Sequence, residues 1–231
     1  DAGHPVCTWQ LVPVDDVECS IGPRLHGTPI EDAWTWPRHF VERVAALLRD
    51  LHQLPATGWG PLENRTDRLH GTSTAPTAGI VERWFHAPIW PFDESELDTH
   101  PLATIAPDLL PTLAPLEREI VAAAIEPFGV LHSDLHRQHL LHTGDKLTGM
   151  LDFGDAFIGS TAWDFALLHW YYGPQNTQAV AHAYDPDRDL AARGAILGVA
   201  VGCYKIAKTP SNGTTLQSQL RSLLDTLPAA R

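Results

Sequence analysis

Lysine is almost missing from this sequence of 231 residues, since only three of its 16 basic residues are lysines and the first is Lys146. We therefore expect any activity that needs a lysine in the first half of the fold to obtain it from outside this chain. Basic residues as a whole are few, because 28 acidic residues leave a net charge of −12. A general nucleic-acid binder carries a basic surface, so the composition argues against nucleic acid as a partner and leaves a cationic small molecule as an acceptable one.

Cysteine is sparse as well: Cys7, Cys19 and Cys203 form no CxxC pair. Such a set is typical of reduced thiols, so we expect a cytoplasmic protein without a disulfide framework. No stretch approaches the roughly 18–20 uninterrupted apolar residues of a membrane span, which argues against a membrane partner. The only methionine is Met150 and no signal peptide is recognisable, so we expect further residues before Asp1. No feature of the sequence indicates an oligomeric state.

Hydrophobic periodicity predicts a small amount of sheet followed by a mostly helical domain. A short hairpin is expected where apolar residues flank Thr143-Gly144-Asp145-Lys146, because Gly-Asp suits its tip. Residues 55–107 are rich in Pro, Gly and Thr and show little periodicity, so we expect an irregular, functional segment with at most a short helix from Glu82. The remaining expectations are strands over 6–14 and 17–21, a turn over 129–132, and helices over 37–51, 109–125, 161–172, 177–184, 188–206 and 214–227.

The densest polar cluster surrounds the predicted hairpin. His132-Ser133-Asp134-Leu135-His136-Arg137-Gln138-His139 precedes it, and Asp152-Phe153-Gly154-Asp155 follows thirteen residues after His139. A hairpin returns the chain to its starting point, so Asp134 and His139 can face Asp152. One carboxylate could then accept a proton, while an imidazole and a second carboxylate hold a divalent cation.

This ordered set resembles the kinase catalytic and metal loops, and more closely the aminoglycoside phosphotransferase and choline kinase family. That family carries H-G-D-x-x-x-x-N followed by a hydrophobic residue and D-x-x-D. Here His132-Ser133-Asp134 replaces HGD, Leu151-Asp152-Phe153-Gly154-Asp155 matches the second block, and Ala162-Trp163-Asp164 matches the Asp at a helix start. The resemblance implies an α+β, protein-kinase-like fold: a mostly helical large lobe with a remnant of the small β-lobe at the N-terminus.

The resemblance also implies roles for single residues. Asp134 would be the catalytic base, His132 would brace its loop, and Asp164 would accept hydrogen bonds from the loop backbone. His139 and Asp152 would hold Mg²⁺, with Mn²⁺ as a possible substitute, against the phosphates of ATP or GTP. His139 stands where the family usually has Asn, but macrolide phosphotransferases of this family also carry His there.

The same resemblance divides the chain. Residues 1–28 would end the small lobe and form the hinge, with Gly27 as the hinge glycine and with adenine pairing to the C=O of Pro23 and the N–H of Leu25. Residues 29–231 would form the helical catalytic lobe, with a substrate-binding insertion at about 55–107. The nucleotide loop and phosphate-binding lysine would lie upstream, in about 70 to 100 further residues.

The implied function is transfer of a nucleotide γ-phosphoryl group to a hydroxyl of an aminoglycoside, a macrolide or a similar small molecule. The acidic composition suits a cationic antibiotic, whereas His139 and the aromatic residues Trp84, Phe85, Trp90 and Phe92 suit a bulkier, more apolar acceptor. Two alternatives remain open here: a metal-dependent hydrolase built on His132, Asp134, His136 and His139, and a catalytically silent kinase-like binding module.

Overall fold

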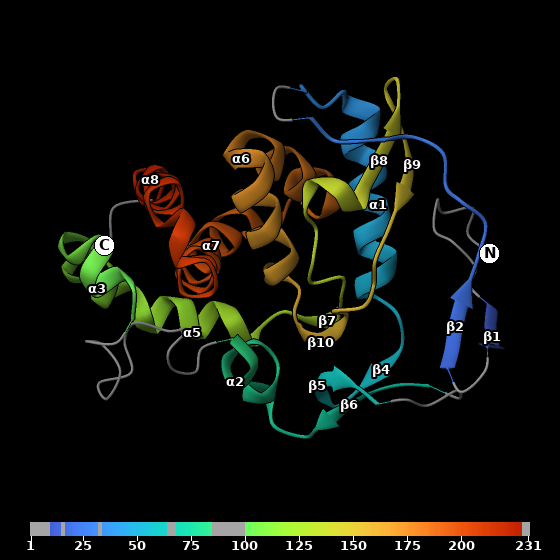
Figure 1. Cartoon of the computed structure of the whole chain (residues 1–231), viewed down its shortest axis with the longest axis horizontal. Coiled ribbons are helices and arrows are strands. Elements are labelled where there is room, and N and C mark those ends of the chain that lie inside the picture. The colour runs from blue at the N-terminus through green and yellow to red at the C-terminus, as the bar shows by residue number, and fades with distance from the viewer. Residues whose placement is uncertain (1–9, 15–16, 32–33, 64–67, 85–99, 228–231) are drawn as a thin grey trace.

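The computed structural model describes residues 10–14, 17–31, 34–63, 68–84 and 100–227 of the chain. The C-terminal helices lie on the left and the N-terminal hairpin lies at the right edge, while the helix over 38–52 lies between them, beside the hairpin over 140–150 (Figure 1). The helices are α1 (Arg38–His52), α2 (Ile80–Trp84), α3 (Leu102–Ile105), α4 (Leu110–Leu113), α5 (Glu117–Ile125), α6 (Ala162–Tyr184), α7 (Leu190–Lys208) and α8 (Gly213–Leu224). The strands are β1 (Gln10–Val14), β2 (Val17–Ile21), β3 (Thr28–Pro29), β4 (Ala56–Thr57), β5 (Trp59–Leu62), β6 (Leu69–Ser73), β7 (Phe128–Leu131), β8 (Leu140–Thr143), β9 (Lys146–Met150) and β10 (Phe157–Ser160).

The helical core follows the predicted periodicity. Helix α1 begins directly after Pro37 and buries Phe40, Val44 and Leu48 completely, on the face that the apolar spacing indicated. Helix α7 has the length and apolar composition of a membrane span, but 61% of that window is buried inside the protein. It packs against α5, α6 and α8, which explains its apolar composition as that of a central core helix.

Helix α6 joins two segments that the sequence separates. The predicted helices over 161–172 and 177–184 are confirmed: α6 consists of two helical segments that meet at a kink at Gly173, whose φ is 80°. Pro174 follows directly and cannot donate the hydrogen bond of a helix interior, so the two residues together kink the helix.

The described strands form three separate sheets. The strands β1 and β2 form a separate antiparallel pair, in agreement with the two predicted strands, and the hairpin of β8 and β9 is also confirmed. The hairpin forms a three-stranded sheet with β3, and Gly27 precedes β3 with a φ of 137°. A side chain at Gly27 would collide with Thr148 of β9, so the glycine allows this close approach.

The structure corrects three expectations from the sequence. Residues 129–132 are not a turn but belong largely to β7, and the irregular segment contains β4, β5 and β6. These strands join β7 and the unpredicted β10 in a five-stranded sheet of order β4-β6-β5-β10-β7. Strands of two to five residues carry almost no periodicity, so only their partners, distant in the sequence, define them. The helix predicted over 109–125 is instead divided into α4, a 3₁₀ turn over Ala114–Leu116, and α5. Pro111 lies in the first turn of α4 and Pro115 in that of the 3₁₀ turn, where no backbone donor is needed.

Candidate active site

A loop between β7 and β8 carries the polar cluster, and one buried carboxylate holds this loop in place. Asp164, in the first turn of α6, accepts the backbone N–H of His132 at 2.9 Å and that of Ser133 at 2.7 Å. Its third partner is His52 Nε2 at 3.0 Å, at the end of α1. Burial pushes the pKa of Asp164 upward, but the hydrogen bonds of His52 and Ser133 and the nearby His132 outweigh it, so the pKa lies below its ordinary value.

His132 braces the loop with both ring nitrogens. Its Nε2–H donates to the carbonyl of Leu151 at 2.7 Å, and its Nδ1 accepts the backbone N–H of Asp134 at 3.2 Å. Burial lowers the pKa of His132, which keeps the ring in this neutral tautomer. Neither ring nitrogen has a free lone pair, so His132 cannot bind a metal. A metal-dependent hydrolase built on His132, Asp134, His136 and His139 would therefore lack one of its four ligands.

The backbone at Ser133 explains why glycine is usual at this point of the motif. Its φ of 70° lies in the left-handed region, where a Cβ costs about 1–2 kcal/mol. The turn directs Asp134 outward, with its side chain 28% exposed, while the Ser133 hydroxyl is buried and has no hydrogen-bond partner among the described residues. The loop therefore presents one accessible carboxylate on a backbone that is fixed from behind.

His139 and Asp152 meet across the hairpin, as the sequence predicts. His139 Nδ1–H donates to the carbonyl of Asp134 at 2.7 Å, so in the neutral ring Nε2 keeps its lone pair. That nitrogen lies 3.6 Å from Asp152 Oδ2, and the other Asp152 oxygen accepts the N–H of Gly154. With the imidazole neutral, these two atoms would offer a cation one nitrogen and one oxygen ligand; with Nε2 protonated, they form an ion pair.

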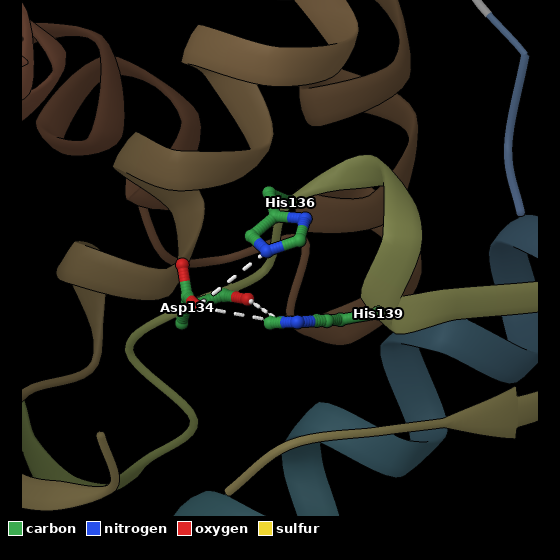
Figure 2. A group of neighbouring side chains, drawn as sticks. All are labelled: Asp134, His136 and His139. Atoms are coloured by element: carbon green, nitrogen blue, oxygen red, sulfur yellow. Dashed lines mark hydrogen bonds and ion pairs between the residues drawn. The ribbon is translucent and has the colours of Figure 1, made fainter. Parts of the chain in front are cut away.

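His136 lies beside His139 and Asp152, but its hydrogen bonds leave no ring nitrogen free to bind a metal. His136 and His139 both turn toward Asp134 (Figure 2), and the ligand atoms of the three residues lie within 4.8 Å of one another. His136 Nδ1, however, accepts the backbone N–H of Gln138, so its Nε2 carries the proton and points at Asp134 Oδ2 from 3.7 Å. Burial and the neighbouring His139 lower the pKa of His136, which favours this neutral form.

The predicted adenine contacts lie in the link between β2 and β3. The side chain of Leu25 packs beside Gly149 of β9, the strand that leads to Asp152. The link between β2 and β3 therefore lies beside β9, while pairing of adenine with Pro23 and Leu25 stays a prediction. Phe85, Trp90 and Phe92 lie outside the described residues, as does the side chain of Trp84.

Sequence reasoning missed His52, the third partner of Asp164. Its Nδ1 hydrogen bonds with the Tyr184 hydroxyl at 3.1 Å, so the end of α1 and the end of α6 both support the anchor of the loop. The only signal was a histidine on the apolar face of a predicted helix, and such a residue needs a buried polar partner.

The fold and this site define a protein-kinase-like phosphotransferase domain. The chain matches the phosphotransferase enzyme family (APH) over residues 9–195, and it belongs to that family. Two curated relatives are homoserine kinases: that of Methylobacterium nodulans is 29% identical over 164 residues, covering 66% of this chain and 46% of the relative. That of Methylocella silvestris is 27% identical over 190 residues, covering 79% and 51%. The chain thus spans about half the length of these relatives.

Solved structures show the same fold. A thermostable mutant of aminoglycoside phosphotransferase APH(4)-Ia, in complex with ADP and hygromycin B, has a TM-score of 0.64 at 13% identity, covering 100% of this chain and 80% of that one. Macrolide 2′-phosphotransferase MphH from Brachybacterium faecium has a TM-score of 0.52 at 17% identity, covering 98% and 75%. These likenesses confirm the predicted fold class.

Proposed function

We propose that the protein transfers the γ-phosphoryl group of ATP or GTP to a hydroxyl group of a small molecule. One observation carries the proposal: Asp134 is accessible on a loop pinned to buried Asp164, and His139 Nε2 faces Asp152 Oδ2 at 3.6 Å beside it. An accessible carboxylate beside a nitrogen and an oxygen that could bind a cation supports phosphoryl transfer, which needs both. Names of similar structures support nucleotide use, since they include complexes with ADP, AMP-PNP and GDP.

Each residue then has a defined task. Asp134 accepts the proton of the acceptor hydroxyl while the new O–P bond forms and the bond between the γ-phosphorus and the β-phosphate oxygen breaks. His132 and Asp164 hold the loop backbone, so the carboxylate of Asp134 keeps its orientation during this step. His139 and Asp152 provide one nitrogen and one carboxylate ligand for Mg²⁺ or Mn²⁺. When bound, the cation neutralises charge on the nucleotide phosphates.

The acceptor is a small hydroxylated molecule in this proposal, and three classes have support. Hygromycin B and gentamicin appear in the names of similar structures, and the net charge of −12 suits such cationic antibiotics. A macrolide is supported by the MphH likeness and by His139. The names of the curated relatives add homoserine, a smaller alcohol.

A phosphate-transfer screen of the full-length protein tests the proposal. Radiolabelled ATP and GTP are supplied with Mg²⁺ and with an aminoglycoside, a macrolide or L-homoserine, and phosphorylated acceptor is measured. We expect transfer to at least one class, and Asp134→Asn should reduce turnover by roughly 10²–10⁴-fold at unchanged nucleotide affinity. Asp145→Asn, at the exposed tip of the hairpin, is the matched control and should keep full turnover.

Three results would contradict the proposal. Phosphate-ester hydrolysis without nucleotide would favour the metal-dependent hydrolase. Nucleotide binding without transfer to any acceptor would favour the silent binding module. Turnover of Asp134→Asn within about threefold of the wild type would remove Asp134 from the role of base.

A further inference from the structure

A lysine without an anionic partner in the described structure lies beside the catalytic loop. Lys205, in the last turn of α7, is half-buried, and its Nζ lies 5.3 Å from the centre of the Tyr171 ring and 5.9 Å from that of Tyr204. The Tyr171 ring in turn lies 6.0 Å from the ring of His136, whose Nε2 is 3.7 Å from Asp134 Oδ2. One aromatic ring therefore separates the ammonium group from the loop that presents the proposed base.

The charge of Lys205 reaches this loop. Burial lowers the pKa of His136, His139 lowers it further, and the ammonium group of Lys205 contributes in the same direction. Lys205 forms no ion pair with a carboxylate in the part of the chain that the structure describes. Although the whole chain has a net charge of −12, the charge that α7 brings to this side of the loop is positive.

The helix dipole accounts for the neighbouring lysine but not for the placement of Lys205. Positive side chains in the last turn of a helix interact favourably with its dipole, and Lys205 and Lys208 both lie there. Lys208 is exposed, with its Nζ 5.7 Å from the centre of the Tyr204 ring. Lys205 instead reaches Tyr171 of α6 as well. Cation–π attraction holds its ammonium group over the rings but satisfies none of its three N–H donors, which are left for a ligand.

The position of Lys205 in the site favours contact with the acceptor over contact with the nucleotide. The proposed cation ligand Asp152 meets the loop at His139. Lys205 approaches the loop at His136, through the ring between them. The nucleotide phosphates follow the cation, and an in-line transfer places the acceptor hydroxyl opposite the leaving oxygen. The His136 side of Asp134 is therefore left for the rest of the acceptor.

The chemistry of an ammonium group limits what the acceptor carries. Such a group has three N–H donors and no lone pair, so it binds oxygen acceptors and repels a cation. One ammonium group balances one negative charge. A carboxylate carries one such charge at neutral pH, whereas a phosphate group carries about −1.5 to −2.

We propose that Lys205 binds a carboxylate of the acceptor, so that the substrate is a hydroxy acid and not a polycationic antibiotic. The proposal rests on the proposed function, because Lys205 would hold the acid end of the acceptor while the hydroxyl group donates to Asp134. Lys205 is thus a specificity-determining residue, which contributes affinity for the acceptor and takes no part in the transfer of the phosphoryl group.

Removal of the charge from the full-length protein tests the proposal. Lys205→Met deletes the ammonium group and keeps an unbranched apolar side chain. Binding is measured without nucleotide, by saturation-transfer NMR titration of D-gluconate and D-glucitol, which differ only by a carboxylate in place of a hydroxymethyl group. L-Homoserine and L-homoserinamide form a second, shorter pair, in which the amide replaces the carboxylate.

We expect the acid of at least one pair to bind the wild type, and Lys205→Met to weaken this binding by about ten- to a hundredfold, through loss of a charge-assisted hydrogen bond. The neutral partner should bind more weakly than the acid and equally well to both proteins. Lys205→Arg should restore most of the affinity for the acid, because it restores the charge. Lys146→Met, which removes the same charge from the exposed hairpin, should leave this affinity unchanged.

Circular dichroism establishes that each variant is folded, and Lys205→Gln replaces Lys205→Met if the latter does not fold. The proposal would be wrong if neither acid bound, if an acid bound equally well to wild type and Lys205→Met, or if the neutral partner lost affinity to the same extent. Tighter binding of hygromycin B than of either acid would also overturn it, because the site would then prefer a polycation.

The two proposals fail separately. Absence of phosphoryl transfer to every acceptor would refute the proposed function but would not alter the binding of an acid measured without nucleotide. Transfer to a hydroxy acid with the same KM in Lys205→Met as in wild type would support the function and refute the role of Lys205.

Discussion

Asp164→Asn is the sharpest test of how this site is held together. In the wild type, Oδ1 accepts the N–H of Ser133, while Oδ2 accepts the N–H of His132 and the Nε2–H of His52. An amide has only one oxygen. Whichever way the Asn side chain is turned, its NH₂ group therefore faces one of the two backbone N–H groups, donor against donor.

The expected cost follows from these contacts. Loss of one charge-assisted hydrogen bond costs about 1.5–3 kcal/mol, and a buried N–H left unpaired costs about 1–3 kcal/mol. The two costs partly count the same lost interaction, so their sum overstates the total. Because Asp164 is completely buried, water cannot replace the lost acceptor. We expect the free energy of unfolding to fall by about 2–4 kcal/mol, or ~5–15 °C in melting temperature for a domain of this size. Turnover should also fall, because the backbone next to Asp134 loses its anchor.

Urea unfolding followed by circular dichroism gives the stability, and the phosphate-transfer assay gives turnover for the protein that remains folded. Asp145→Asn is the control, since its carboxylate is 60% exposed and contacts only the exposed His39 in the described structure. It should change stability by less than about 0.5 kcal/mol. A change of less than about 0.5 kcal/mol in Asp164→Asn, with full turnover, would refute the reasoning that this carboxylate positions the loop.

Three further predictions concern the loop and the stability of the protein. His139→Ala should raise the Mg²⁺ concentration needed for half-maximal rate, whereas His139→Asn should retain activity, and an unchanged midpoint in folded His139→Ala would exclude a ligand role. Ser133→Gly should stabilise the protein by about 1 kcal/mol in urea unfolding, because relief of the φ of 70° and removal of a buried unpaired hydroxyl exceed the entropic cost of glycine. Stability should decline as pH falls from about 6.5 toward 5, since burial lowers the pKa values of His132 and His169 and the unfolded chain then binds protons that the folded protein does not. An unfolding free energy that is constant between pH 7 and 5 would contradict the last prediction.

The sequence by itself determined the long helices, the hairpin and the chemistry of the loop. Helix α1 is readable because its apolar residues repeat with the helical period over 15 residues. The hairpin is readable because both strands and the Gly-Asp tip are contiguous in the chain. The short hairpin also explains why the pairing of His139 with Asp152 could be predicted. Only thirteen residues separate them in the chain, and a hairpin brings its two ends together.

Only the tertiary structure decided the features that depend on distant partners. His52 lies 112 residues from Asp164, so no local pattern could assign it to the loop anchor. The strands β5 and β10 pair across nearly 100 residues and are too short to show a period of their own. Local periodicity records which face of an element is buried, whereas the partner that covers this face is chosen by the packing of the whole chain.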